Sequence, residues 1–258
     1  MLAHQTFGDP DAPPVLIAHG LYGSGRNWGV IAKRLGDTRH VITVDMRNHG
    51  SSFHSENNGY DDLADDLAAV IDTLGRPMDV VGHSMGGKAA MMLALRAPDR
   101  VRGLVVGDIA PVPYTHSQLP MIDAMRAVDL TAVARRSDAV AQLEAQGVDP
   151  AVCSFLTQSL DLQAKAWRLN LDALAAEMPK IMGFPSTDAQ FAGPTLFLSG
   201  AASDYVKPEH RDTIRALFPV ARFAKLPKAG HWLHADDPRG FEGTVRAFLD
   251  AVQSRPLT

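Results

Sequence analysis

Ser84 lies in a pattern of residues that can present a serine hydroxyl as a nucleophile. Residues 82–86 read Gly-His-Ser-Met-Gly, with an apolar stretch at 80–81 before them and a helix-forming stretch at 88–96 after them. This order predicts a sharp strand-to-helix turn, in which small glycines let the backbone pass and the serine hydroxyl stands above the sheet. The pattern favours attack of Ser84 on a carbonyl carbon. A glycine-rich turn around a buried capping serine is the structural alternative.

A histidine near the end of the chain is placed to act as general base for that serine. His231 lies in the string Ala-Gly-His-Trp-Leu-His at 229–234, between the last expected strand and the last expected helix. A loop there reaches the strand ends where the serine must be, and Gly230 lets it approach closely. His234 is the alternative base, but its surroundings in the sequence indicate packing against the core. We therefore predict that His231 is the base.

Two backbone amides are expected to bind the oxygen that becomes negative during acyl transfer. Residues 17–23 read Ile-Ala-His-Gly-Leu-Tyr-Gly and follow the first strong strand pattern. Hydrolases of this kind take one oxyanion-hole amide from such a loop and the other from the residue after the nucleophile. This predicts the N–H groups of Leu21 and Met85, with His19 shaping the loop. An ordinary glycine-rich loop would also explain the string at 17–23 taken alone.

The elements that must position these residues are those of an α/β protein. Apolar runs typical of strands occur at 15–18, 41–44, 80–81, 104–106 and 196–198, with a further strand near 221–226. None alternates polar with apolar residues, which is expected of a mainly parallel sheet with helices on both faces. Helical stripes follow at 60–74 and from Pro238 onward, the latter through Phe241, Val245, Phe248, Leu249 and Val252.

The stretch from 114 to 191 interrupts this alternation. It shows helical patterns at about 119–134, 138–146, 150–158 and 167–178, and no convincing strand. We expect a helical lid at 114–191, inserted between two strands of an α/β-hydrolase core formed by 1–113 and 192–258, in one domain overall. Met121 and Met125 fall in this lid, where methionine suits either core packing or an adaptable acyl pocket.

Composition excludes several other classes of protein. The chain has 258 residues, a net charge of −4 and scattered basic residues, so nothing indicates nucleic-acid binding. Cys153 is the only cysteine, which excludes an intramolecular disulfide and a multi-cysteine metal site. Residues 1–14 carry no basic residue and do not resemble a signal peptide, and no apolar run is long enough to span a membrane. A cytoplasmic enzyme is expected.

Longer strings identify a family. The strings Val-Asp-Met-Arg-Asn-His-Gly at 44–50, Gly-His-Ser-Met-Gly-Gly-Lys at 82–88, Asp-Ile-Ala-Pro-Val-Pro-Tyr at 108–114 and Trp-Arg-Leu-Asn-Leu-Asp at 167–172 join those at 19–24 and 229–234. Together they resemble the α/β-hydrolase superfamily and, within it, the YbfF-type esterases and their mitochondrial abhydrolase relatives. The resemblance covers nearly the whole chain, lid included, and implies an esterase or thioesterase acting on acyl substrates.

The acid of the expected triad has two candidates. Most α/β hydrolases carry it three residues beyond a glycine after the next-to-last strand, and here that position holds Ser203, followed by Asp204. The family resembled also has a serine there and takes its carboxylate from the end of the preceding strand, which corresponds to Asp108. We predict Asp108 as the acid, with Ser203 linking it to His231; Asp204 remains the alternative.

The predicted reaction is acyl transfer from an ester or thioester to water, with Ser84 as nucleophile and no metal or organic cofactor. The partner is then a small acyl ester or thioester, and the acyl chain, the leaving group and the oligomeric state stay open. Other chemistry on the same scaffold is the first alternative, namely a lyase, a C–C bond hydrolase or a perhydrolase. A non-catalytic binding protein that kept the fold is the second.

Overall fold

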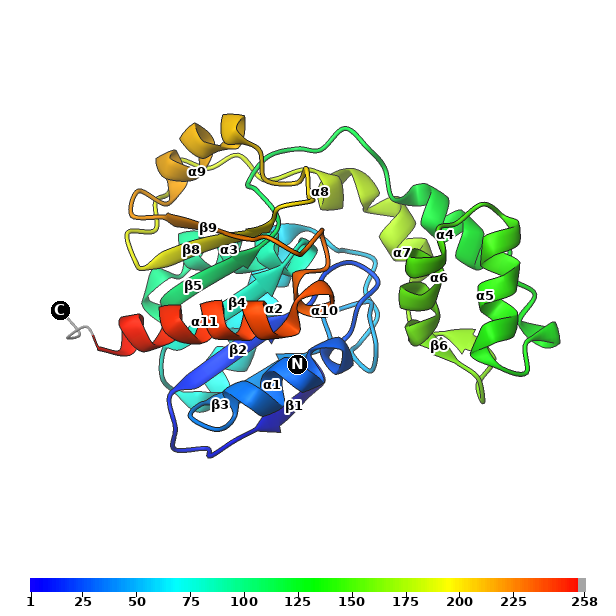
Figure 1. The fold of residues 1–258 in the computed structure, drawn as a ribbon, viewed down its shortest axis with the longest axis horizontal. Coiled ribbons are helices and arrows are strands. Elements are labelled where there is room, and N and C mark those ends of the chain that lie inside the picture. Colours follow the sequence, from blue (N-terminus) through cyan, green and yellow to red (C-terminus); the bar gives the residue numbers. More distant parts are fainter. Residues whose placement is uncertain (255–258) are drawn as a thin grey trace.

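Seven strands form one sheet in the computed structural model, which describes residues 1–254 (Figure 1). The strand order is β1-β3-β2-β4-β5-β8-β9, and every neighbouring pair is parallel except β1 with β3. The strands are β1 (His4–Phe7), β2 (Pro14–Ala18), β3 (His40–Val44), β4 (Met78–His83), β5 (Val101–Gly107), β8 (Thr195–Gly200) and β9 (Arg222–Leu226). The predicted α/β class is confirmed. The strand β1 was not predicted, because its residues are mostly exposed and form no apolar run.

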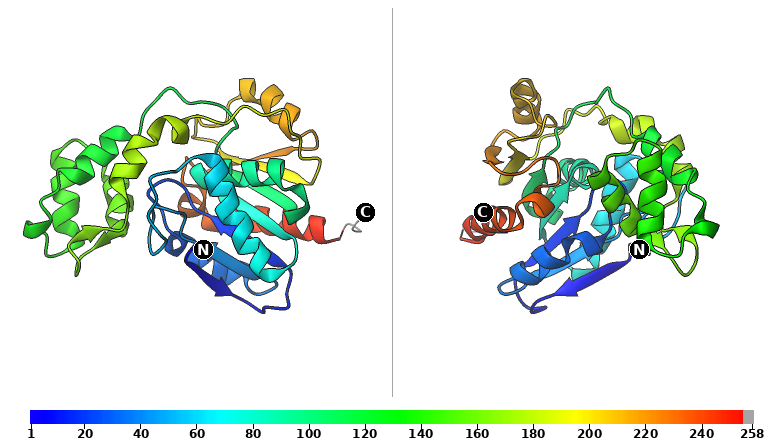
Figure 2. Two further views of the ribbon diagram at one scale, coloured as in Figure 1. Left: turned by 180° about the vertical axis from the view of Figure 1, so that it is seen from behind. Right: turned by 45° about the vertical axis from the view of Figure 1, so that its right-hand side comes forward.

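Helices cover both faces of this sheet (Figures 1 and 2). One face carries α1 (Gly29–Leu35) and α11 (Pro238–Gln253), and the other carries α2 (Tyr60–Leu74), α3 (Met85–Arg96) and α9 (Arg211–Leu217). Val15 and Ile17 of β2 belong to the core under α1 and α11, whereas Leu16 and Ala18 belong to the core under α2 and α3. Because successive side chains of a strand point to opposite faces, covering both faces requires the uninterrupted apolar runs.

Local residue chemistry sets the ends of the two longest helices. Asp61 and Asp62 lie in the first turn of α2, where the helix dipole favours negative charge, and Gly75 ends the helix at φ 62°. For α11, the side chain of Asp237 accepts a hydrogen bond from the Gly240 N–H, and Pro238 occupies the first turn. No helix within residues 1–254 is both long and apolar enough to cross a bilayer.

The chain between β5 and β8 forms a separate helical layer, which we call the inserted segment (residues 114–191). Most of it projects from one side of the sheet (Figures 1 and 2). Its elements are α4 (Leu119–Arg126), α5 (Arg136–Ala145), α6 (Pro150–Leu156), β6 (Leu160–Asp161), β7 (Ala166–Trp167), α7 (Leu171–Ala176) and α8 (Met178–Met182). The other short elements of the chain are α10 (Leu233–Asp236) and the 3-10 helices at Gly25–Trp28, Pro98–Arg100, Leu130–Ala132, Thr157–Ser159 and Pro208–His210.

The predicted helix at 119–134 is wrong in its second half. The helix α4 ends at Arg126, and only a 3-10 turn follows, at Leu130–Ala132. The side chain of Asp129 accepts hydrogen bonds from the backbone N–H and hydroxyl of Thr131, and the Asp129 N–H donates to the side chain of Gln142. An aspartate whose side chain accepts hydrogen bonds from nearby backbone in this way favours the start of a new helical turn and disfavours continuation of the preceding helix.

The prediction of a helix at 167–178 and of no strand in this region is also wrong. Trp167 belongs to β7, which pairs antiparallel with β6 in a two-residue ladder. The helix α7 begins only after Asn170, whose side chain accepts a hydrogen bond from the Ala173 N–H, and a second helix starts near Pro179. Two-residue strands carry no periodicity that a sequence pattern can show.

Parallel pairing brings the loops of five strands to one edge of the sheet. In register, Ala18 of β2 faces Gly82 of β4, and Gly107 of β5 faces both His83 of β4 and Leu198 of β8. The strands β2, β4, β5, β8 and β9 therefore end side by side. The segments that follow them are the ones that carry the predicted chemistry.

Candidate active site

The turn after β4 holds Ser84 in a backbone conformation with φ 52° and ψ −119°. Two residues before it and two residues after it, only glycine fits. A Cβ on Gly82 would lie 2.3 Å from the carbonyl oxygen of Gly86, and a Cβ on Gly86 would lie 2.5 Å from that of Ala18. Because α3 begins at Met85, the serine hydroxyl stands at the junction of strand and helix, next to the positive end of the helix.

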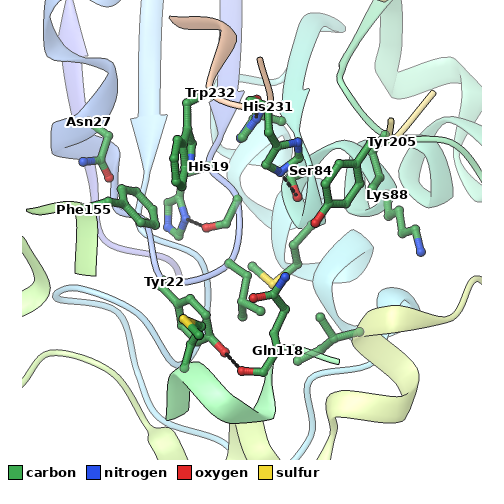
Figure 3. A pocket seen from close by; sticks show the side chains of 18 of the residues that line it. His19, Tyr22, Asn27, Ser84, Lys88, Gln118, Phe155, Tyr205, His231 and Trp232 are labelled. Carbon is green, nitrogen blue, oxygen red and sulfur yellow. Dashed lines mark hydrogen bonds between the residues drawn. The ribbon is translucent and has the colours of Figure 1, made fainter. Parts of the chain in front are cut away.

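His231 joins Ser84 to Asp108 (Figure 3). Its Nε2 lies 3.2 Å from the Ser84 Oγ, and its Nδ1 lies 2.8 Å from an oxygen of Asp108. The Asp108 carboxylate is fully buried, whereas the imidazole keeps 23% of its surface exposed. This is the geometry in which a histidine accepts a proton from a serine while a carboxylate holds the ring in the required tautomer.

The Asp108 carboxylate is held from the next strand. One oxygen accepts a hydrogen bond from the Gly200 N–H at 3.1 Å, and the other accepts from both His231 and the Ser203 hydroxyl. The Asp108 N–H donates to Leu198 at 2.8 Å. Asp204 is exposed and makes no hydrogen bond or ion pair with any residue of the described chain. The structure thus brings Asp108 and Ser203 to His231 and leaves Asp204 outside.

The loop after β2 turns toward Ser84. Leu21 and Met85 both line the cavity that contains the serine, and neither backbone N–H donates to another group within residues 1–254. The neighbouring Tyr22, at φ 65°, donates its N–H to Nε2 of His49 at 3.1 Å. Two free amides beside a serine hydroxyl can bind an oxyanion.

Two buried histidines support this loop in their neutral forms. Nε2 of His19 accepts the Met46 N–H at 2.9 Å, as Nε2 of His49 accepts that of Tyr22. Burial lowers the pKa of His19 to about 4 and the pKa of His49 to about 3. An imidazolium cannot accept a hydrogen bond, so the loop geometry requires that both rings stay uncharged.

A cavity of about 460 Å³ surrounds Ser84, within the range of small-molecule sites. Figure 3 shows Trp232, Phe155 and Asn27 on one side of the serine and Tyr205 and Lys88 on the other. Its apolar wall comes largely from the inserted segment, through Met121, Val152, Phe155, Leu156, Ile181 and Met182. Met125 is fully buried among other side chains and does not line the cavity.

The charge of this cavity is low. Of the described residues that line it, Lys88 alone has a side chain that is ordinarily charged at neutral pH, and burial lowers the pKa of its ammonium to about 7. Within residues 1–254, no group of three or more histidine, cysteine, aspartate or glutamate side chains is arranged to hold a metal ion.

Residues 13–238 match the family model described as the alpha/beta hydrolase fold. The chain belongs to the α/β-hydrolase family. It is 43% identical over 254 residues to a mouse (Mus musculus) protein named sn-1-specific diacylglycerol lipase ABHD11, covering 94% of this chain and 82% of the relative. Esterase YbfF of Escherichia coli (strain K12) is 37% identical over 243 residues, which cover 92% and 93% of the two chains.

A solved structure agrees with this assignment. A protein described as a marine microorganism esterase has a TM-score of 0.91 and 34% identity to this chain, over 96% of this chain and 98% of the other. The resemblance of this α/β hydrolase to YbfF-type esterases and their relatives is thereby confirmed.

His234, the alternative base, also lines the cavity of this α/β hydrolase, but the contact with the Ser84 hydroxyl is made by His231. Its ring stacks on Trp28 at 4.1 Å between centroids, and burial lowers its pKa to about 4. Between the two stands His83, whose Nε2 lies 2.7 Å from the carbonyl oxygen of His231. The neutral His83 ring donates to that carbonyl, and so it fixes the loop that carries the predicted base.

Tyr205 is a site residue that the sequence did not reveal. Its ring stacks on the imidazole of His231, with 4.0 Å between centroids and 20° between planes. Its hydroxyl lies 2.9 Å from Nε2 of His116 at the start of the inserted segment. The only local signal is its place two residues after Ser203, and stacking across the site is set by the strand order.

Proposed function

We propose that this protein is a carboxylic-ester hydrolase that works through an acyl-enzyme on Ser84. The observation that carries the proposal is the continuous contact from Ser84 Oγ through the His231 ring to the buried Asp108, beside two amides that donate to no group within residues 1–254. The names of the relatives, diacylglycerol lipase and esterase, support ester hydrolysis as the reaction.

In the first half-reaction, Ser84 Oγ attacks the ester carbonyl carbon while Nε2 of His231 takes the hydroxyl proton. Asp108 accepts the Nδ1–H bond and stabilises the imidazolium. The N–H groups of Leu21 and Met85 bind the oxyanion of the tetrahedral intermediate, where one such donor contributes about 3 kcal/mol. As the intermediate collapses, Nε2–H protonates the leaving alcohol oxygen, and the acyl group remains on Ser84.

The second half-reaction repeats these steps with water as nucleophile. His231 takes a proton from the water as its oxygen attacks the acyl carbon, and it returns that proton to Ser84 Oγ as the carboxylic acid leaves. The Ser203 hydroxyl supports both half-reactions by donating a hydrogen bond to the Asp108 carboxylate. The groups required are all side chains or amides of this chain.

The cavity supports an uncharged acyl group as substrate. Its wall is mostly apolar and contains no aspartate, glutamate or arginine among the described lining residues. Burying a charged group there without a partner would cost several kcal/mol. We propose that the inserted segment, residues 114–191, is a lid that forms the acyl wall. A cytoplasmic location stays a prediction.

The test is to trap the acyl-enzyme. Purified protein is mixed with p-nitrophenyl esters, and p-nitrophenol release is followed together with the intact mass of the protein. We expect a burst of p-nitrophenol and a mass gain of one acyl group on the peptide containing Ser84, which a fluorophosphonate probe should also label. Ester turnover distinguishes this reaction from C–C bond hydrolysis. Absence of turnover and of labelling would instead favour a binding protein that kept the fold.

A further inference from the structure

Lys88 is a buried lysine whose role the proposed reaction does not explain. It lies on α3, one turn after Ser84, and its side chain is only 1% exposed. Removing an ammonium group from water is costly unless other groups replace the lost hydration. A lysine in this position therefore needs strong hydrogen-bond acceptors around its ammonium group.

Three backbone carbonyl oxygens surround the ammonium. Nζ donates to Val112 at 2.9 Å, to Met182 at 3.1 Å and to Gly183. The ring centroids of Tyr114 and Tyr60 lie 4.7 Å and 5.6 Å from the same nitrogen. An ammonium has three N–H donors, so all of them are used within the protein. The two aromatic faces add attraction for a positive charge.

These acceptors lie just before the start of the inserted segment and at the end of α8, the last helix of that segment. We call residues 112–114 the first junction and residues 181–183 the second junction. The two junctions also contact each other, because the Tyr114 N–H donates to the Met182 carbonyl at 2.9 Å. The Tyr60 hydroxyl, at the start of α2, donates to the Ile181 carbonyl at 2.6 Å. The outgoing and returning chains therefore meet the core around one ammonium group.

We propose that Lys88 is a positioning residue that clamps both junctions of the inserted segment to α3 and thereby sets the acyl side of the cavity. Tyr114, Ile181 and Met182 belong to these junctions, and their side chains line the cavity with Ser84. Because its three donors are occupied, Lys88 is not a receptor for a carboxylate of the substrate. The statement about the acyl side rests on the proposed ester hydrolysis, whereas the clamp itself is a property of the fold.

The test compares Lys88→Met with Lys180→Met. Methionine keeps much of the side-chain length and apolar volume of Lys88 but has no donor. Lys180 is an exposed lysine of α8 that pairs with Glu177, so its replacement controls for loss of a lysine in the inserted segment. Hydrogen exchange of peptides covering both junctions is measured, together with kcat and KM for p-nitrophenyl esters from acetyl to octanoyl.

In Lys88→Met we expect exchange at both junctions to be about tenfold faster or more, because three carbonyls lose their hydrogen-bond donor. KM for the octanoyl ester should rise about tenfold while kcat for the acetyl ester stays within about threefold, since the acyl wall and not the nucleophile is disturbed. Lys180→Met should match the wild type in both measurements.

Unchanged exchange at both junctions in folded Lys88→Met would overturn the clamp. A loss of kcat that is equal for all acyl lengths, with normal exchange, would also overturn it and place Lys88 at the chemistry of Ser84. If Lys88→Met does not fold, Lys88→Gln is measured instead; its uncharged amide has two N–H donors, so exchange at both junctions should again be faster than in the wild type, by less than the roughly tenfold expected for methionine. Faster exchange in a protein that hydrolyses no ester would support the clamp and reject the proposed function, so the two failures are distinguishable.

Discussion

Ser84 and Asp108 both have a positive φ, at 52° and 48°. Such a conformation costs a residue with a side chain about 1–3 kcal/mol and persists where the surroundings impose it. Here the Ser84 N–H donates to the carbonyl oxygen of Gly107 at 2.9 Å, and the Asp108 N–H donates to that of Leu198 at 2.8 Å. Each turn is therefore fixed to the next strand. In these backbone conformations both side chains reach His231 at the edge of the sheet.

At the residue scale, Ser84→Ala should abolish ester hydrolysis and leave the fold nearly unchanged. The substitution removes one oxygen that lies outside the core, so the melting temperature should stay close to that of the wild type. Turnover of p-nitrophenyl acetate and thermal unfolding are the measurements. Retention of more than a few per cent of the wild-type rate would reject Ser84 as the nucleophile.

The two candidate aspartates should differ strongly. Asp108→Asn should lower kcat by about 10⁴, the loss seen for the corresponding change in serine proteases, because the amide no longer holds the required imidazole tautomer. The exposed Asp204→Asn is the matched control and should stay within about tenfold of wild type. Ser203→Ala should fall between the two, because its hydroxyl donates to Asp108. The opposite ranking would restore Asp204 as the acid.

At the element scale, the helices of the inserted segment should decide which acyl groups fit. Met121 of α4 and Met182 of α8 line the cavity, so Met121→Ala and Met182→Ala should shift the preference toward bulkier acyl groups. The shift is modest, because one methylene changes discrimination by about 1–3 kcal/mol. The measurement is kcat/KM over a series of acyl lengths.

Met125 provides the control for this series. It is fully buried in α4 but does not line the cavity. Met125→Ala should therefore lower the free energy of unfolding by about 2–5 kcal/mol and leave the acyl profile as in the wild type. An acyl profile that responds equally to Met121→Ala and Met125→Ala would mean that the helical layer loosens as a whole instead of forming a specific wall.

At the scale of the whole molecule, buried neutral histidines make stability depend on pH. Burial lowers the pKa of His19 and of His234 to about 4 and that of His49 to about 3, from an ordinary value of 6.5. Between pH 6.5 and about 4 the unfolded chain binds protons that the folded chain does not. The free energy of unfolding should therefore fall as the pH falls, by up to about 1.4 kcal/mol per pH unit for each histidine.

Urea unfolding at pH 7, 6 and 5 measures this dependence. His234→Phe keeps an aromatic ring against Trp28 but removes one titrating group, so its slope of stability against pH should be smaller by about one proton. An equal slope in the wild type and in His234→Phe would show that His234 takes up its proton in the folded protein as readily as in the unfolded chain.

The sequence by itself determined the class of fold, six of the seven strands of the sheet and the family. Covering both faces of a parallel sheet forces uninterrupted apolar runs, and these are visible at 15–18 and 104–106 without any structure. The turn around Ser84 is local only in part: a Cβ on Gly82 would collide with the nearby Gly86, whereas a Cβ on Gly86 would collide with Ala18 of a distant strand. The helix boundaries in the inserted segment were less visible in the sequence, because each depends on one N-capping side chain, that of Asp129 or that of Asn170.

Only the tertiary structure decided which side chains meet at the edge of the sheet. Asp108 and Asp204 are both aspartates near strand ends, and the strand order brings Asp108 to within 2.8 Å of His231, which is 123 residues away. The stacking of Tyr205 on His231 and the three carbonyls around Lys88 likewise join distant segments. Local patterns fix the conformation of a few neighbouring residues, whereas contacts such as these depend on how strands are ordered and where loops cross.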